Sequence, residues 1–284
     1  MRILTHPDEL AAWPDAVLVP TMGALHVGHA ELFRVAGQAS GGRLPVIASV
    51  FVNPKQFNED VDFTTYPRDL DADAAIAERA GVAAVFAPSV EVVYPEGEPL
   101  HTPPVPEVGR FPGLEDRYRP GHLEGVVQVV ARLFDLVQPR GAIFGEKDFQ
   151  QLLLVRAMVN QVQTDTTRAE RWPGLEVLAA PTVREDDGVA LSSRNRRLDE
   201  ASRAAARGIP LALQAAHAAQ HPQTAESIMR RTLDEHGLEV EYAVVRDSRT
   251  LQPIDDFREP SRGLIAAWIG GVRLIDNRNL AVWK

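Results

Sequence analysis

The chain of 284 residues contains no cysteine. This absence excludes disulfide scaffolds, thiol nucleophiles, iron–sulfur clusters and cysteine-based zinc ribbons. No uninterrupted apolar run approaches the roughly 20 residues that a membrane-spanning helix requires. The N-terminal sequence MRILTHPDEL also lacks the apolar stretch of a signal peptide. We therefore expect a cytoplasmic protein with no membrane partner.

Basic residues are also outnumbered by acidic ones. There are 30 Lys and Arg residues against 39 Asp and Glu residues, so the formal net charge is -9. A nucleic-acid binder gathers basic residues against phosphate, and this balance disfavours such a partner. Hydrophobic residues make up 45% of the chain and charged residues 24%, values typical of a folded globular protein.

Three common nucleotide and metal motifs are missing from the sequence. There is no GxxxxGK[ST] phosphate loop, no GxGxxG after a strand and no HExxH helix. An enzyme of this sequence that uses a nucleotide must therefore hold the phosphates in another way.

Short apolar runs alternate with amphipathic stretches over the first 180 residues or so, which is typical of parallel strands joined by helices. The predicted strands are 16–20, 45–52, 82–87, 142–144 and 175–179, and the predicted helices are 29–39, 69–80, 123–137 and 149–162. After Pro181 the character changes. Residues 199–237 are helical by composition apart from Pro210 and Pro222, and strand-like runs such as 240–245 dominate the remainder.

This pattern predicts an α/β protein of two domains. Residues 1–182 form a Rossmann-like parallel sheet domain, and residues 183–284 form a smaller α+β domain. The Pro-rich stretch 88–120 shows little periodicity and is too long for an idle loop, so we expect it to form a lid or a binding surface.

The first polar cluster, PTMGALHVGH at 20–29, follows the first predicted strand. His26 and His29 are three residues apart at a helix start, Gly28 lets a ligand approach the backbone, and a helix N-terminus attracts anions. Open α/β sheets bind ligands outside the carboxyl ends of their strands, which favours a phosphate cradle. Alternatively, the histidines cap or pack. Metal chelation lacks the nearby carboxylate or cysteine ligands it would need.

Two further clusters suit phosphate. GEKDFQQ at 145–151 lies at another strand end, where Lys147 can place its charge on a polyphosphate and Gln151 can turn inward one helical turn later. LSSRN at 191–195 follows Arg184 and sets hydroxyls beside an arginine. Each motif taken alone also fits an ordinary charged turn.

Two other clusters suit a small polar acid. FVNPKQF at 51–57 ends the second strand, with TYPR at 65–68 close behind. Asn and Gln side chains bind hydroxyls, carboxylates and amides, although a proline-stabilised loop with a capping Asn is the alternative. RPGH at 119–122 supplies a guanidinium that could bind a carboxylate through two hydrogen bonds.

In combination these clusters resemble the pantoate-β-alanine ligase (pantothenate synthetase) family. PTMGALHVGH, FVNPKQF, TYPR, RPGH, GEKDFQQ, PTVRE and LSSRN occur in that family's order and spacing over nearly the whole chain. HxGH alone indicates only the wider class of nucleotidyl transferases, whereas GEKDFQQ followed by LSSRN is more specific. The chain departs from the family at Val27, Phe149 and Leu191, where acidic, Tyr and Met residues are common.

The resemblance implies ATP-dependent condensation of (R)-pantoate with β-alanine through pantoyl adenylate, with Mg²⁺ and a homodimer. It implies catalytic roles for His26, His29, Lys147 and Arg194, with His29 as proton donor. The implied ATP contacts are Met22, Gly23, Ala24, Leu25, His26, Val27, Gly28, His29, Gly145, Glu146, Lys147, Asp148, Val183, Leu191, Ser192, Ser193 and Arg194. The implied substrate contacts are Pro20, Asn53, Gln56, Tyr66, Arg119 and Gln151.

The metal ligands are left unassigned, although Asp71 and Asp73 lie in a stretch that the resemblance associates with Mg²⁺. Two alternatives stay open. One is another HxGH nucleotidyl transferase, for which the acidic balance disfavours a tRNA substrate. The other is a nucleotide-binding module without catalysis.

Overall fold

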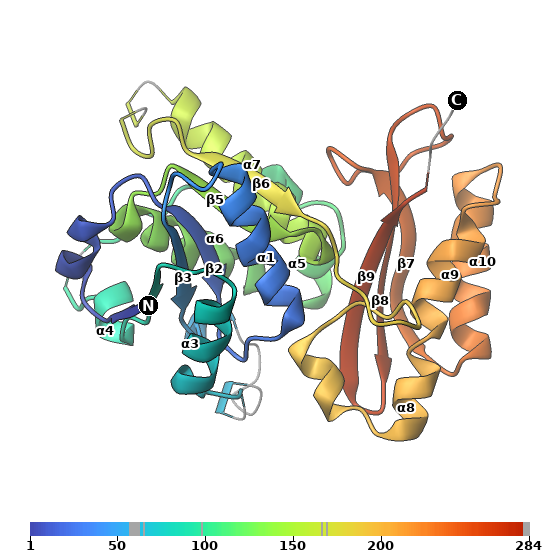
Figure 1. The fold of residues 1–284 in the computed structure, drawn as a ribbon. Helices are drawn as coiled ribbons and strands as arrows, with labels where there is room; N and C mark the ends of the chain where they lie inside the picture. Colours follow the sequence, from blue (N-terminus) through green and yellow to red (C-terminus); the bar gives the residue numbers. More distant parts are fainter. Residues whose placement is uncertain (57–62, 65, 98, 166, 169, 281–284) are drawn as a thin grey trace. The chain divides into compact units, whose positions relative to one another are not determined.

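The computed structural model describes residues 1–56, 63–64, 66–97, 99–165, 167–168 and 170–280 (Figure 1). The chain divides into two compact units. The first consists of Met1–Glu146 and Gln150–Pro181, and the second of Lys147–Phe149 and Thr182–Lys284.

The first unit is built on a six-stranded parallel sheet with the strand order β1-β4-β3-β2-β5-β6. The strands are β1 (Arg2–Leu4), β2 (Val17–Thr21), β3 (Val46–Val50), β4 (Ala84–Phe86), β5 (Gly141–Gly145) and β6 (Glu176–Ala180). The central strands are continuous apolar runs because both faces of the sheet are covered. From β2 the chain winds outward to β3 and β4, then returns to β5 and β6. The order therefore reverses between β2 and β5, where doubly wound sheets bind ligands.

Helices connect these strands (Figure 1). They are α1 (Val27–Ala39), α3 (Leu70–Arg79), α4 (Val90–Val93), α5 (Glu115–Tyr118), α6 (His122–Val137) and α7 (Phe149–Thr164), with 3-10 turns η1 (Pro7–Ala12), η2 (Pro54–Gln56), η3 (Glu107–Gly109) and η4 (Glu146–Asp148). Local chemistry sets their ends. The Asp69 side chain caps α3 by accepting from the Ala72 amide, and α6 ends at Gln138, whose φ of 48° is left-handed.

The second unit contains a three-stranded antiparallel sheet, β7 (Glu239–Asp247), β8 (Ser261–Ile269) and β9 (Val272–Asn279), with α8 (Glu200–Ala205), α9 (Gly208–Ala216), α10 (Pro222–Glu235) and the 3-10 turn η5 (Ser193–Arg197). Leu213 of α9 and Met229 of α10 pack into one core with Ile265 of β8. Pro210 lies in the first turn of α9, and Pro222 is the first residue of α10. Proline is tolerated in both places because the first-turn amides have no partner within the helix.

The fold predicted from the sequence is confirmed: a Rossmann-like parallel sheet followed by a smaller α+β unit. The predicted strands and helices lie within a few residues of the observed ones. The sequence pattern did not predict β1, a strand of three residues, or the short helices α4 and α5 within 88–120. Such segments are too short to show a period. Among the described residues, no helix has the length and apolarity needed to cross a bilayer.

One close approach positions the polar turn after β3. A Cβ atom placed on Gly125 of α6 would lie 2.3 Å from the Lys55 carbonyl oxygen and 3.3 Å from the Gln56 nitrogen. Only a glycine lets α6 lie this close to η2. The turn that contains Lys55 and Gln56 therefore packs directly against the backbone of α6.

We expect Gly125→Ala to lower the free energy of unfolding by about 1–3 kcal/mol, because the new methyl group must displace backbone atoms of η2. Gly37→Ala in α1 is the matched control, since nothing lies within 4 Å of its added Cβ. That variant should raise the free energy of unfolding by about 0.5–1 kcal/mol through helix propensity. Urea denaturation followed by circular dichroism measures both. Changes of the same sign would contradict the close-approach argument.

Candidate active site

The polar clusters of the first unit lie at one edge of its sheet. β2 pairs with β3 so that Thr21 lies opposite Val50, and β5 pairs with β6 so that Gly145 lies opposite Ala180. These are the carboxyl ends of parallel strands. The turns that begin after β2, β3 and β5 therefore start at the same edge of the sheet, where such sheets bind ligands.

The turn between β2 and α1 is held by a buried carboxylate. Asp73 of α3 is 3% exposed, and its two oxygens accept hydrogen bonds from the Ala24 amide (3.1 Å) and the Leu25 amide (2.7 Å). Gly23 and Ala24 both have left-handed backbones, with φ of 78° and 51°. A Cβ on Gly23 would lie 2.6 Å from an Asp73 oxygen. Asp73 therefore holds the left-handed turn in place, and the position of this turn determines where α1 begins.

His26 and His29 form a reciprocal cap at the start of α1. The Nδ1 atom of His26 accepts from the Gly28 amide (3.0 Å), and the Nδ1 atom of His29 accepts from the His26 amide (3.2 Å). The ring centroids lie 4.2 Å apart. Capping, the alternative reading of the sequence, is thus an observed role of both histidines.

This cap also fixes the chemistry of both rings. A backbone N–H can only donate, so each Nδ1 must be the unprotonated nitrogen, and a neutral ring then carries its proton on Nε2. Each ring therefore has its N–H donor at Nε2. An anion would be stabilised at this position by hydrogen bonds and by the helix dipole.

The turn after β3 holds a chain of hydrogen bonds. Tyr94 donates its hydroxyl to Asn53 Oδ1 (2.8 Å), and Asn53 Nδ2 donates to Gln56 Oε1 (3.0 Å). Burial raises the pKa of Tyr94 well above its usual range, and the hydrogen bond to Asn53 opposes this only partly. The Tyr94 hydroxyl therefore keeps its proton at neutral pH and acts as a donor.

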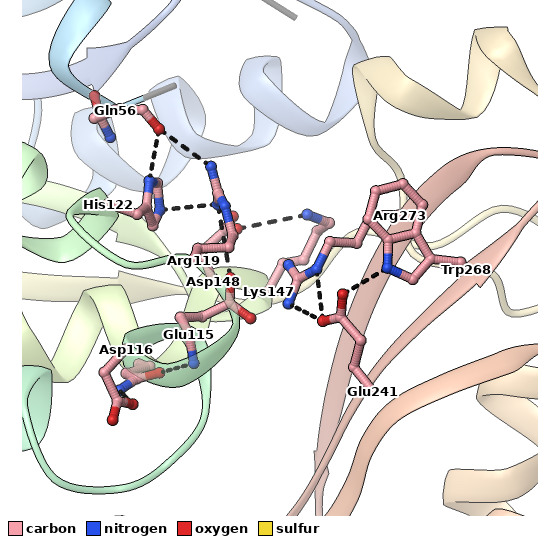
Figure 2. A network of polar contacts seen from close by, with 11 residues as sticks. Gln56, Glu115, Asp116, Arg119, His122, Lys147, Asp148, Glu241, Trp268 and Arg273 are labelled. Atoms are coloured by element: carbon pink, nitrogen blue, oxygen red, sulfur yellow. Dashed lines mark hydrogen bonds and ion pairs between the residues drawn. The ribbon is translucent and has the colours of Figure 1, made fainter. Parts of the chain in front are cut away.

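Arg119 and His122 hold the backbone of the same turn (Figure 2). Arg119 Nη2 donates to the Gln56 carbonyl oxygen (3.3 Å), and His122 Nδ1 lies 3.1 Å from that oxygen. Arg119 also contacts His122 Nε2 at 2.9 Å and forms an ion pair with Glu115 at 3.6 Å. The Arg119 guanidinium, predicted to bind a substrate carboxylate, has these protein groups as partners here.

In the second unit, residues 183–191 form one hairpin that connects the motifs PTVRE and LSSRN. The Leu191 amide donates to the Val183 carbonyl (2.9 Å), and Arg184 pairs with Ala190 across an antiparallel bridge. Arg203 holds the connecting turn by ion pairs to Glu185 and Asp187. Hydrogen bonding by Arg203 is the main reason that the pKa of Asp187 lies below its ordinary value.

After the hairpin, Ser192 caps the turn η5. Its Oγ atom accepts from the Arg194 amide at 3.3 Å. The predicted residues Val183, Leu191, Ser192, Ser193 and Arg194 thus lie in one continuous, half-buried structure.

Two adjacent residues of strand β9 contact Lys147 and this hairpin. Asn277 donates to the Lys147 carbonyl (2.9 Å), and the neighbouring Asp276 forms an ion pair with Arg184 at 2.6 Å. The Lys147 ammonium lies 3.6 Å from the Asp148 carboxylate, and the Lys147 side chain is 19% exposed (Figure 2). The Lys147 backbone is therefore held by β9, and its ammonium pairs with the neighbouring Asp148.

The remaining predicted residues vary in exposure. Pro20, Met22, Tyr66 and Gln151 are half-buried, whereas Val27 is 72% exposed. Phe57 and Thr65, which belong to the motifs FVNPKQF and TYPR, lie outside the described residues.

No pattern in the sequence marked Tyr94 or Asn277, because each reaches its partner only through the tertiary fold. The hydrogen bonds of Asp73 were also not predicted, although its position beside Asp71 had marked it as a possible metal neighbour.

No group of three or more His, Asp or Glu side chains that could hold a metal ion occurs among the described residues. Each Asp73 oxygen accepts a hydrogen bond from one backbone amide of the turn after β2.

We expect Asp73→Asn to lower the free energy of unfolding by about 1–3 kcal/mol, because an NH₂ group would face a backbone N–H in a buried place. Asp71→Asn is the control, since Asp71 is exposed in the same helical turn. Its loss should stay under about 1 kcal/mol. Chemical denaturation of the two variants and the wild type measures the difference. Equal losses would show that the Asp73 contacts do not hold the turn.

The chain is similar to known proteins over nearly its whole length. Residues 3–279 match the family model described as pantoate-beta-alanine ligase. A pantothenate synthetase from Phocaeicola vulgatus is 44% identical over 293 residues, covering 98% of both chains. The crystal structure of pantothenate synthetase from Thermus thermophilus has a TM-score of 0.89 at 40% identity, covering 99% of this chain and 100% of that one.

A third relative was solved with ligands. It is pantoate-beta-alanine ligase from Francisella tularensis complexed with beta-gamma ATP and beta-alanine, with a TM-score of 0.78 at 30% identity, covering 100% of this chain and 99% of that one. The family model and the relatives each extend across both units. This chain therefore belongs to the pantoate-beta-alanine ligase family.

Proposed function

We propose that this enzyme uses ATP to condense (R)-pantoate with β-alanine, releasing pantothenate, AMP and pyrophosphate. The observation that carries the proposal is the reciprocal histidine cap at the switch point of the sheet. It sets Nε2 as the N–H donor of both rings at the start of α1. Family membership and the ATP and β-alanine named for the Francisella tularensis enzyme support the same reaction.

In the first step, a pantoate carboxylate oxygen attacks the α-phosphorus of ATP. The bond from that phosphorus to the bridging oxygen breaks, and pyrophosphate leaves with the bond electrons. No covalent enzyme intermediate is needed. Catalysis then consists of alignment and of stabilising the charge that develops on phosphate oxygens. His26 and His29 would donate to those oxygens, and His29 would supply the proton in the role that the family resemblance gives it.

The second unit would supply the cationic part of the site. Lys147 would place its ammonium on the leaving pyrophosphate, and Arg194 its guanidinium on neighbouring phosphate oxygens. Ser192, Ser193, Val183 and Leu191 would line the nucleotide. We expect residues 183–284 to act as a lid over the ATP- and pantoate-binding domain 1–182.

In the second step, the β-alanine amine attacks the carbonyl carbon of pantoyl adenylate, AMP leaves and the amine loses a proton. An amine of this kind has a reference pKa of roughly 10.4, so a proton acceptor or a minor neutral fraction is required. Gln56, Gln151, Tyr66 and Arg119 are the proposed contacts of pantoate and β-alanine.

Mg²⁺ remains a prediction. The described residues contain no metal cluster built from the protein alone, and Mg²⁺ commonly binds through substrate phosphates with only one or two carboxylates. The homodimer and the cytoplasmic location also remain predictions.

The reaction is tested by incubating the purified protein with Mg-ATP and measuring AMP with pantoate alone, β-alanine alone, both or neither. We expect sustained AMP release only with both substrates. Release with another acid in place of pantoate would favour a different nucleotidyl transferase. ATP binding without release would favour a module without catalysis.

Lys147→Ala should slow adenylate formation on the order of 10²- to 10³-fold, because a preorganised charge on the leaving group is removed. A single-turnover assay of pyrophosphate release measures this step directly. Arg231→Ala is the charge-matched control, since the Arg231 side chain is 71% exposed on α10. Full adenylate formation by Lys147→Ala would remove the leaving-group role.

A further inference from the structure

Asn53 is completely buried, and two backbone groups fix which way its amide faces. Its side chain Oδ1 accepts from the Lys55 amide (3.2 Å), and its Nδ2 donates to the Gly125 carbonyl (3.1 Å). A backbone N–H can only donate and a backbone carbonyl can only accept. The reversed amide would place like groups against each other at both contacts, so only one orientation is stable.

The other two hydrogen-bonding positions of Asn53 are also filled. Tyr94 donates to Oδ1 at 2.8 Å, and the second Nδ2 hydrogen points to Gln56 at 3.0 Å. An Asn amide has two donor hydrogens and two acceptor lone pairs. All four are therefore used by protein groups, which accounts for an amide with 0% exposure.

The orientation of the Asn53 amide determines the orientation of the Gln56 amide. Because Nδ2 is a donor, Gln56 must turn its Oε1 atom inward, and its Nε2 hydrogens are then the part of the amide directed elsewhere. The Gln56 backbone is held as well. Arg119 can only donate, so His122 Nε2 accepts from it and His122 Nδ1–H donates to the Gln56 carbonyl. Backbone and side chain of Gln56 are thus fixed independently.

We propose that Asn53, supported by Tyr94, is a positioning residue that presents Gln56 Nε2 as a hydrogen-bond donor to pantoate, and that Asn53 does not itself touch the substrate. The inference rests on the proposed function, in which Gln56 contacts pantoate. It replaces the direct substrate contact predicted for Asn53 from the sequence. An oriented donor suits the carboxylate and hydroxyl oxygens of pantoate, which accept hydrogen bonds.

A double-mutant cycle tests the proposal. Pantoate is titrated calorimetrically into wild type, Asn53→Ala, Gln56→Ala and the double variant, each saturated with α,β-methylene ATP. Each single variant should weaken pantoate binding by about 10-fold or more, the loss expected for one hydrogen bond to a charged group. If Asn53 acts only through Gln56, the double variant should bind pantoate as Gln56→Ala does.

Affinity for the ATP analogue should be the same in all four proteins, which a general structural defect would not produce. Asn160→Ala, at an exposed position on α7, is the matched control and should bind pantoate like wild type. Should Asn53→Ala fail to fold, Tyr94→Phe replaces it in the cycle. Its effect of about 2- to 10-fold should vanish in the Gln56→Ala background.

The outcomes separate this inference from the proposed function. If the wild type binds pantoate but the affinity losses of the two single variants multiply in the double variant, the positioning role is overturned. A direct contact of Asn53 with pantoate would then be restored. Wild-type protein that binds the ATP analogue but not pantoate would overturn the proposed function, and this inference with it.

Discussion

The hydrogen bonds from the Ala24 and Leu25 amides to the buried Asp73 carboxylate determine where the first turn of α1 lies. The chain leaves β2 through two consecutive left-handed residues, a costly conformation for Ala24 that persists only where the surroundings impose it. Asp73 imposes it from another helix. The histidine cap, and with it the proposed phosphate site, depends on this one carboxylate.

Backbone groups of fixed polarity then decide the chemistry of the side chains. Amides at the start of α1 make Nδ1 of both histidines an acceptor, which leaves Nε2 as the donor. The Lys55 amide and the Gly125 carbonyl act in the same way on Asn53, and through it on Gln56. A side chain whose donor and acceptor atoms are preset needs no reorganisation when an anion arrives, which is the physical basis of electrostatic catalysis.

In the second unit, contacts with protein groups also fix the positions of the predicted site residues. Asp276 and Asn277, adjacent on β9, hold Arg184 of the hairpin and the carbonyl of Lys147. The motifs PTVRE and GEKDFQQ, which are far apart in the sequence, thus contact adjacent residues of one strand. The Lys147 ammonium pairs with the neighbouring Asp148 carboxylate at 3.6 Å.

The fold class and the grouping of the polar motifs could be predicted from the sequence alone. Apolar periodicity marks buried strands and amphipathic helices, and parallel strands necessarily bring their carboxyl ends to one edge, so the turns at 20–29, 51–56 and 145–146 could be placed together in advance. Which atoms face one another depends instead on the tertiary structure. The contact of Asp73 with the Ala24 amide spans 49 residues, that of Tyr94 with Asn53 spans 41, and that of Asn277 with Lys147 spans 130. No local period records such pairings, because they arise from packing between elements rather than from the conformational preference of any one segment.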